Sequence, residues 1–595
     1  MRAALVAFVL AFVCVPVAYA ATPTAPVYDS EGRVVETPFA PVRPPAALTE
    51  KRATDIFLHH PKVVDWLKRY PKVVRYDAAF DEEYRYWQVH VWSGDAGEVA
   101  TGRVDDASGV VTEAWTGPQV AWKMARGGPG AFGGEKTNDP TIWLGLCALF
   151  LLGLADLRRP LSVRNLDLLA LLSFSVSLWF FNRGDIFTSV PLVYPPLLYL
   201  LARTAWIGWR GRVGGSAARP VWPVWALVGA TVFLAGFRIG LNVQTSNVID
   251  VGYAGVIGAE RILDGRAPYG NFPRQGDLKP CGPADAEGEI RERIQDNGRC
   301  EASNEFGDTY GPVSYAAYVP AYLVFGWTGK WDDLPTAHAT AILFDLLCLA
   351  GLGLVGLRYG GRRLAATLAF AWAAFPFTLY VSSSNTNDAI FPAFLIFGFL
   401  LASSAWKRGA LCALAGWTKF ASFVVAPLWL TYDADGGRRR PLLFTAGFAV
   451  ASALALSVLL LEPSPVEAAR TFVDRTVVTQ VTRESPFSLW DWGQYRAAGI
   501  PDLGLVQLVL EAVLVAAGIA VAFVPRRKSP LQLAALTAAL LVAFEFVLTH
   551  WFYLYIPWFF PFVAVAVLSP AVREPAAQEA AEPSGREARE LVATA

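Results

Sequence analysis

The sequence lacks net charge, because its 51 lysines and arginines balance 51 aspartates and glutamates over 595 residues. Zero net charge gives no argument for a nucleic-acid partner, and the basic residues stand in short clusters that membrane topology explains better. Charged residues make up only 17% of the chain, whereas 54% is hydrophobic and arranged in apolar runs. A helical crossing of a bilayer needs about 20 apolar residues, so the sequence predicts a polytopic membrane protein rather than a soluble enzyme with one apolar core.

Cysteine is scarce, with six residues in the whole chain. Cys147, Cys348 and Cys412 lie in apolar segments and are interpreted as small buried hydrophobes. Cys281 and Cys300 flank the polar run GPADAEGEIRERIQDNGR, and in an oxidising compartment they predict a disulfide that closes this loop. A zinc site is the weaker alternative, because neither histidine nor a second cysteine pair accompanies them.

The N-terminal part of the chain predicts export and a small extracytoplasmic domain. Residues 1–20 combine one arginine, a short apolar core and the sequence Ala18-Tyr19-Ala20, a pattern typical of a secretory signal peptide. A Pro/Ala-rich linker is expected at 21–53, an α+β domain at 54–125 and a Gly-rich linker at 126–140. The hairpin around VDDASGVV in this domain resembles a PepSY domain.

Short basic clusters set the expected topology, because cytoplasmic loops are enriched in Lys and Arg. With the N-terminus outside, they predict about 13 membrane segments in the cytoplasmic membrane. Three additional transmembrane helices are expected at 141–206, and the remaining segments at 221–568. Separate crossings at Thr336–Leu357 and Leu364–Val381 flank the RYGGRR cluster.

Two segments depart from simple crossings. Gly311–Trp327 is short and interrupted by Pro320, so it is expected to be an interfacial or re-entrant helix. Gly409–Thr431 begins and ends beside basic clusters and is expected to form two half-helices that meet around Trp417-Thr418-Lys419. The parts then expected outside the membrane are the extracytoplasmic loops 242–335, 382–389 and 462–504 and a disordered cytoplasmic tail at 570–595.

This topology brings two carboxylates to one membrane surface. Asp250 lies in NVIDVGYAGVIGAERILDGRAPYG and Asp388 ends SSSNTND, each at the outer end of a crossing. Separated carboxylates at one surface suit general-base chemistry on a hydroxyl. The alternative is that each caps the helix that follows it, and spacing does not decide between the two. The helix after Asp250, which includes Glu260, is amphipathic, so it either lies on the bilayer to receive a lipid-linked substrate or simply packs.

Several segments in order carry a resemblance to a known family: ERILDGRAPYG, DTYGPVSYAAYVPAYLVFG, SSSNTNDAIFPAFLIFGFLL, GALCALAGWTKFASFVVAPLWL and RESPFSLW. Together they resemble the GT-C membrane glycosyltransferases and are most similar to the bacterial polyprenol-phosphate-mannose-dependent alpha-1,2-mannosyltransferases. The likeness runs from about Val221 to Leu568. It implies an all-α polytopic membrane fold of GT-C type, to which the small α+β domain is added. The family often has Tyr-Pro-Pro where this chain has Tyr310-Gly311-Pro312.

The resemblance also implies roles for residues of the outer loops. Asp250 is the candidate base that activates an acceptor hydroxyl. Asp388 is a second acid that binds acceptor or, in relatives that use one, a divalent cation; no other cofactor is implied. Asn385 and Asn387 are candidates for binding sugar hydroxyls, and Tyr310 and Glu260 are further substrate-binding candidates.

The donor implied is a sugar, mannose first, on a polyprenyl phosphate, and the acceptor is an extracytoplasmic glycan or glycolipid. The leaving lipid phosphate calls for a cation near the outer interface. Arg483 is the first candidate and Arg475 a weaker one, unless each pairs with a neighbouring acid. Lys419 lies in an apolar hairpin and is a further cation expected to reach the phosphate. A structural ion pair with an acid elsewhere is the alternative for Lys419, its expected partners being Asp345, Glu511 or Glu545.

Two other function classes remain open from the sequence. A transporter or flippase of lipid-linked sugars usually shows repeated halves and acids near the bilayer midplane, and the chain shows no such repeat. A non-catalytic membrane receptor would use the N-terminal domain to sense a ligand, and its function would survive substitution of Asp250 and Asp388.

Overall fold

The computed structural model divides the chain into two units. It describes residues 27–28, 34–36, 45–70, 74–82, 85–93, 98–117, 120, 132–183, 185–211, 222–276, 278–282, 292–330, 333–432, 439–481, 485, 487–492 and 501–569. The predicted signal peptide, the predicted C-terminal tail and Arg483 lie outside the described residues.

The N-terminal region contains a small sheet with helices before it. Its strands lie in sequence order: β3 (Arg75–Asp81), β4 (Tyr86–Trp92), β5 (Glu98–Asp105) and β6 (Val111–Thr116). The helices are α2 (Glu50–Leu58) and α3 (Pro61–Leu67), and a separate short pair is formed by β1 (Val27–Tyr28) and β2 (Val34–Glu36). Every second residue of β4 is buried, because side chains alternate along a strand. The predicted sheet region is thus confirmed.

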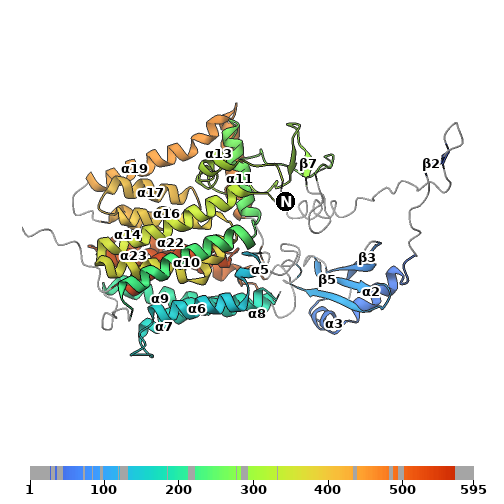
Figure 1. Cartoon of the computed structure of the whole chain (residues 1–595), viewed down its shortest axis with the longest axis horizontal. Helices are drawn as coiled ribbons and strands as arrows, with labels where there is room; N and C mark the ends of the chain where they lie inside the picture. The colour runs from blue at the N-terminus through green and yellow to red at the C-terminus, as the bar shows by residue number, and fades with distance from the viewer. Residues whose placement is uncertain are drawn as a thin grey trace, which may run out of the picture. The chain divides into compact units, whose positions relative to one another are not determined.

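The larger region is a bundle of helices (Figure 1). Its α-helices up to the first outer loop are α5 (Gly134–Thr137), α6 (Pro140–Leu154), α7 (Val163–Phe181), α8 (Ile186–Ser189), α9 (Tyr194–Arg210), α10 (Val224–Thr245) and α11 (Asp250–Leu263). Then follow β7 (Glu292–Ile294), β8 (Cys300–Ala302), α12 (Pro312–Ala316), α13 (Val319–Phe325), α14 (Pro335–Ala374), α15 (Pro376–Ser383), α16 (Ile390–Leu400), α17 (Ala405–Gly416) and α18 (Ala426–Thr431). The last helices are α19 (Arg439–Leu456), α20 (Pro465–Val473), α21 (Thr479–Val481), α22 (Gly504–Phe523), α23 (Pro530–Val547) and α24 (Ile556–Leu568).

Six helices of the described residues are long and apolar enough to cross a membrane: α7, α10, α14, α19 with its extension to Leu461, α22 and α23. Shorter apolar helices span Pro140–Leu154, Asn387–Leu400, Phe420–Thr431 and Tyr553–Leu568. α24 is buried along its whole length, which explains why it is apolar all round. A membrane protein is therefore supported, while the number of about 13 segments and the side on which each loop lies stay predictions.

The 40 residues of α14 are a helical hairpin rather than one long rod. Gly361 has φ 73° and ψ −169°, a conformation that interrupts the helix. A Cβ on Gly356 would lie 2.4 Å from Cα of Ala365, a contact that a continuous helix does not allow. The chain thus turns back at Gly361, inside the RYGGRR cluster that the sequence places between two crossings.

Both unusual segments are broken where the sequence places the interruptions. Gly311–Trp327 forms two short helices, α12 and α13, instead of one crossing. Gly409–Thr431 forms α17, a 3-10 helix at Phe420–Val425 and α18, and the break falls at Trp417–Lys419.

The bundle has two different ends. We call one end the basic end, because the arginines of the α14 turn and those just before α23 lie there. At this end Arg358 donates to Ser403 Oγ at 3.0 Å, and Gln532 at the start of α23 donates to the carbonyl of Gly208 at 2.9 Å. At the opposite end, which we call the loop end, the long connections meet, and α11, α13 and β7 lie there (Figure 1). The Asp250 and Asp388 segments both belong to the loop end, where Ile249 N donates to the carbonyl of Ser384.

Candidate functional site at the loop end

Asp250 is an exposed residue in the first turn of α11. Ile249 holds the N-cap position, and the helix start has no side-chain cap. The Asp250 carboxylate has no hydrogen-bond or ion-pair partner among the described residues, although its carbonyl accepts from Asn304 at 3.3 Å. The capping alternative is therefore wrong for Asp250, and its carboxylate is free to contact a molecule outside the protein.

Asp388 has the opposite environment, since it is 1% exposed. It lies in a 3-10 turn, Asn387–Ala389, and α16 has Ala389 at its N-cap with no side-chain cap, so the capping alternative is wrong for Asp388 as well. Its Oδ1 pairs with Lys419 Nζ at 3.0 Å and accepts from Trp558 Nε1 at 3.1 Å. Its Oδ2 has no hydrogen-bond partner among the described residues.

Lys419 lies at the break that follows α17, and its side chain is 10% exposed. Aromatic rings surround the ammonium group, with centroids at 4.8 Å for Tyr310, 5.4 Å for Trp558 and 5.7 Å for Tyr555. Ring faces stabilise a cation that is partly removed from water. Lys419 thus pairs with Asp388, which sequence reasoning did not consider as its partner.

Further buried polar atoms near this pair have no hydrogen-bond partner among the described residues: Asn387 Oδ1, Tyr318 OH and Glu545 Oε1. Tyr318 and Glu545 lie close enough to Asp388 to interact electrostatically with its carboxylate. We call these residues, with Asp388 and Lys419, the Asp388 cluster. Buried polar groups are nearly always satisfied in folded proteins, so a concentration of unsatisfied ones favours a site that a ligand or water completes.

The Asp250 and Asp388 segments are held together by hydrogen bonds. Ile249 N donates to the carbonyl of Ser384 at 3.4 Å. Asn385 Oδ1 accepts from Asn242 at 2.7 Å, and its Nδ2 donates to Ser246 Oγ at 2.8 Å. Asn385 therefore joins the segments, and its side-chain atoms are already in use, unlike Oδ1 of Asn387.

A glycine stripe lets α11 approach the Asp388 segment closely. A Cβ on Gly252 would lie 2.0 Å from the carbonyl oxygen of Asn385, and one on Gly255 would lie 2.4 Å from the ring of Tyr318. Because only glycine fits at these contacts, the spacing in VGYAGVIGAE fixes the start of α11, and Asp250 with it, against the Asp388 segment.

Glu260, predicted to bind substrate, is 3% exposed and fully engaged. Its carboxylate accepts from Arg261 Nη1 at 2.6 Å, from Tyr322 OH at 2.7 Å and from Arg299. Arg299 lies in the connection between β7 and β8, next to Cys300. Cys300 is joined to Cys281 by a disulfide. In this structure Glu260 anchors the β7–β8 hairpin to α11.

Asp308 is a buried acid that sequence reasoning missed. Its Oδ2 accepts from Gly270 N at 2.7 Å and pairs with Arg475 Nε at 3.4 Å, whereas its Oδ1 has no hydrogen-bond partner among the described residues. Burial raises the pKa of the Asp308 carboxyl. Next to Gly270, Tyr269 donates its OH to the carbonyl of Tyr310 at 3.0 Å. The contacts of Asp308 are thereby linked to Tyr310, whose ring faces Lys419. Its only signal in the sequence is its place in DTYGP.

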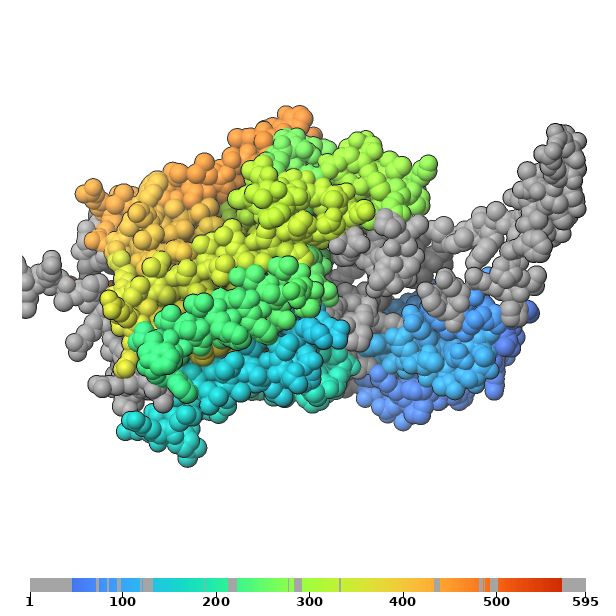
Figure 2. Space-filling model, in the orientation of Figure 1, coloured from blue at the N-terminus to red at the C-terminus, as the bar shows by residue number. Residues whose placement is uncertain are grey.

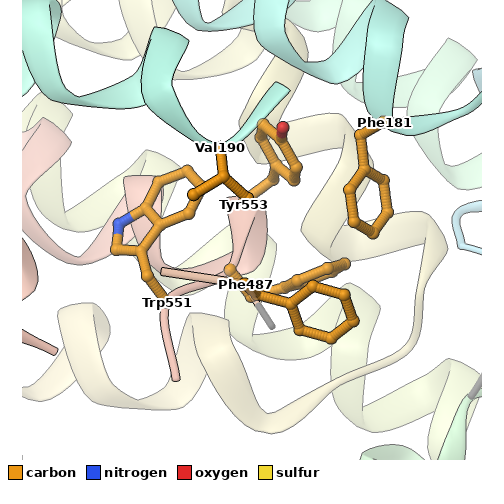
Figure 3. Close-up of a pocket in the computed structure, with 6 residues that line it drawn as sticks. Phe181, Val190, Phe487, Trp551 and Tyr553 are labelled. Carbon is orange, nitrogen blue, oxygen red and sulfur yellow. The ribbon is translucent and has the colours of Figure 1, made fainter. Parts of the chain in front are cut away.

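An aromatic cluster near the loop end is packed too tightly to bind a substrate. The rings of Phe181, Phe487, Trp551 and Tyr553 and the side chain of Val190 surround a cavity of about 10 Å³ (Figure 3). A single water molecule already needs roughly that volume. The cluster therefore serves packing.

No group of three or more His, Cys, Asp or Glu is arranged to hold a metal ion within the part of the chain that the structure describes. We therefore assign no metal site. Comparison with known proteins gives no family, because no family model and no curated protein matches this chain.

Proposed function

We propose that the protein is an integral membrane glycosyltransferase that moves a sugar from a polyprenyl phosphate to an extracytoplasmic hydroxyl. The observation that carries the proposal is one juxtaposition. Within the described residues, an exposed and unpaired Asp250 and a buried, incompletely satisfied Asp388–Lys419 pair lie in segments that hydrogen bonds and close packing join at the loop end.

The proposed reaction is a direct displacement at the anomeric carbon. The acceptor oxygen attacks, and Asp250 takes its proton, since its exposed carboxylate is accessible to a hydroxyl from outside the protein. The new bond joins the acceptor oxygen to the anomeric carbon, and the bond from that carbon to the phosphate oxygen breaks. The electron pair leaves with the lipid phosphate, so the anomeric configuration inverts.

The Asp388 cluster is proposed to hold the donor. Lys419 carries three N–H donors and gives one to Asp388, which leaves donors for the oxygens of a lipid phosphate. Asp388 Oδ2, Asn387 Oδ1 and Glu545 Oε1, which have no hydrogen-bond partner in the described part of the chain, are acceptors, and sugar hydroxyls supply the matching donors. Tyr310 and Tyr555 offer ring faces of the kind that stack on sugars.

The orientation follows from the charge on the opposite end. The basic end includes Arg358, Arg362 and Arg363 in the α14 turn and Arg526 and Arg527 before α23. Because basic residues accumulate in cytoplasmic loops, we assign the basic end to the cytoplasm and the loop end to the outer face.

The test is sugar transfer in membranes that contain the full chain, supplied with radiolabelled polyprenyl-phosphate mannose and glycolipid acceptors. Asp250→Asn is expected to lower transfer by roughly 10²- to 10⁴-fold, the usual contribution of a general base. Asp264→Asn is the matched control, because Asp264 is an exposed acid at the other end of α11. Equal transfer by the wild type and Asp250→Asn would remove Asp250 from the chemistry.

A flippase of lipid-linked sugars is the second candidate, and the break between α17 and α18 favours it. Transporters often build their sites from interrupted membrane helices. A flippase would move labelled lipid-linked sugar between leaflets of a vesicle without forming a new glycosidic bond. Movement that persists in Asp250→Asn, with no glycosylated product, would replace the first proposal with this one.

A further inference from the structure

A groove runs between α10 and the α14 hairpin on the outer surface of the bundle. These helices lie side by side on the face drawn in Figure 2. The groove has a volume of about 590 Å³, within the roughly 300–1,000 Å³ of ligand-binding pockets. Val228 and Val232 form one wall, and Leu354 and Ala366, one from each arm of the hairpin, belong to the other.

Small side chains on the hairpin open this space. Gly353 lines the groove, and a Cβ at this position would meet only Ala369 Cβ, at 4.0 Å. Thr231 also lines it, but its hydroxyl donates to the carbonyl of Leu227 at 2.7 Å within α10. The groove walls therefore offer apolar contact and no polar group that needs a ligand.

Arg362 is the exception among the lining residues. It is exposed, follows the Gly361 turn directly, and has no hydrogen-bond or ion-pair partner among the described residues. Arg358 in the same turn is held by Ser403 and by the ring of Tyr359, and neither Arg358 nor Arg363 lines the groove, so Arg362 is the cation that the groove presents at this mouth. An apolar groove with a guanidinium at one end is complementary to a molecule with an apolar tail and an anionic head.

The length of the groove matches one leaflet of a bilayer. Along α10 its lining runs from Val224 to Val232, and along α14 from Leu349 to Leu357. Each run spans about 12 Å at 1.5 Å per residue, close to half of the roughly 30 Å hydrocarbon core. A transmembrane helix from a partner would need contact over the full thickness, whereas a lipid tail needs one leaflet only.

We propose that this groove is a binding site for an anionic phospholipid of the leaflet at the basic end, with its phosphate on Arg362 and an acyl chain between α10 and α14. The site is distinct from the Asp388 cluster, since it opens at the opposite end of the bundle. It would tie α10 to the hairpin where direct packing between them is incomplete. The proposal does not depend on the transferase activity.

The test is native mass spectrometry of the full chain in detergent, titrated with phosphatidylglycerol or with phosphatidylethanolamine, which has no net charge. The wild type is expected to retain one phosphatidylglycerol preferentially. Arg362→Gln should weaken retention about fivefold, the effect of losing one Arg contact with an anionic lipid. Gly353→Leu, which fills the groove, should abolish retention.

Matched controls separate this site from lipid that coats the protein at random. Arg526→Gln removes an exposed arginine of the same end, and Gly229→Leu adds a side chain on α10 where a Cβ meets open space and which does not line the groove. Both controls should retain the lipid as the wild type does. The proposal is overturned if all variants retain it equally, if the two lipids bind alike, or if Gly353→Leu instead dissociates an oligomer, which would assign the groove to a second copy.

Discussion

Two buried aspartate–cation pairs in the helix bundle differ in how completely their polar atoms are satisfied. Both carboxylate oxygens of Asp345 accept hydrogen bonds from Arg238: Oδ2 from Nε at 3.0 Å and Oδ1 from Nη2. Oδ1 also accepts from the indole of Trp372 at 2.9 Å. Asp388 binds Lys419 with one oxygen and leaves the other without a partner among the described residues. The cations differ too, because Arg238 is 1% exposed whereas the Lys419 side chain is 10% exposed.

This difference separates a structural pair from a functional candidate. Nη1 of Arg238 donates to Thr378 Oγ1 at 3.0 Å and to the carbonyl of Ala373 at 3.4 Å, so four of the five guanidinium N–H donors are bonded within the protein. Through these bonds Arg238 joins α10 to both arms of α14. A lysine with spare donors beside unsatisfied acceptors stabilises the fold less and leaves room for a substrate.

The largest expected effect is on stability, at the satisfied pair. Asp345→Ala leaves the Arg238 charge buried and unpaired, which costs about 3–5 kcal/mol, and is expected to abolish most folded protein. Asp388→Ala is expected to cost less, because the partly exposed Lys419 can turn its ammonium toward water. The measurement is thermal unfolding in detergent, followed by size-exclusion chromatography.

A double variant tests whether charge burial is the cause. Replacing both partners, Arg238→Leu with Asp345→Leu, removes the unpaired charge and should recover much of the stability lost in Asp345→Ala. If Asp345→Ala and Asp388→Ala unfold at the same temperature, the two pairs are equivalent and the comparison fails.

The next effect is on activity, at the incompletely satisfied pair. Lys419→Met keeps an apolar stem of similar length among the rings but removes the charge proposed to meet the lipid phosphate. Transfer from polyprenyl-phosphate sugar is expected to fall roughly 10²- to 10³-fold, as for loss of a donor that stabilises developing negative charge. Unchanged transfer in a folded Lys419→Met protein would leave the pair structural and contradict its proposed role.

The sequence predicts much of the arrangement of helices, because apolar runs and basic clusters are local signals. The turn at Gly361 and the break at Trp417–Lys419 fall where those signals place them. The sequence marks Asp388 as an acid at the outer end of an expected crossing and Lys419 as an ionisable residue in an apolar hairpin. Their pairing was not predicted, because it depends on how the turn after α15 packs against the break after α17, and no local pattern encodes that contact.

The missed residues show the same limit. Asp308 and Tyr318 lie among many polar and aromatic residues of the long segment between α11 and α14, and their sequence neighbours do not distinguish them. Each is marked by one buried oxygen, Oδ1 of Asp308 and OH of Tyr318, that has no hydrogen-bond partner among the described residues, and that is a property of the packed structure. The glycine stripe of α11 was visible in VGYAGVIGAE, but its meaning requires knowing that Asn385 and Tyr318 lie against it.

A moderate effect on stability is expected at Thr378, which belongs to the satisfied pair. Its hydroxyl accepts from Arg238 and donates to the carbonyl of Trp372 at 2.6 Å. Thr378→Val keeps the shape and removes both bonds, so it should cost about 1–3 kcal/mol through the unsatisfied guanidinium. Transfer activity per folded molecule should stay at the wild-type level, and a large loss of activity at normal stability would show that this pair also serves the chemistry.

The smallest effect on stability is expected at Tyr318, whose hydroxyl is buried in the Asp388 cluster without a hydrogen-bond partner among the described residues. Tyr318→Phe removes a group that makes no bond within the described protein, so the unfolding temperature should stay the same or rise slightly, in contrast to Thr378→Val. If a sugar hydroxyl or phosphate oxygen completes this site, the same change should raise KM for the lipid-linked donor about fivefold, the effect of one lost hydrogen bond. A fall in stability with KM unchanged would mean that the hydroxyl serves the fold, and the contrast between the two aspartate pairs would then rest on Asp388 Oδ2 and Lys419 alone.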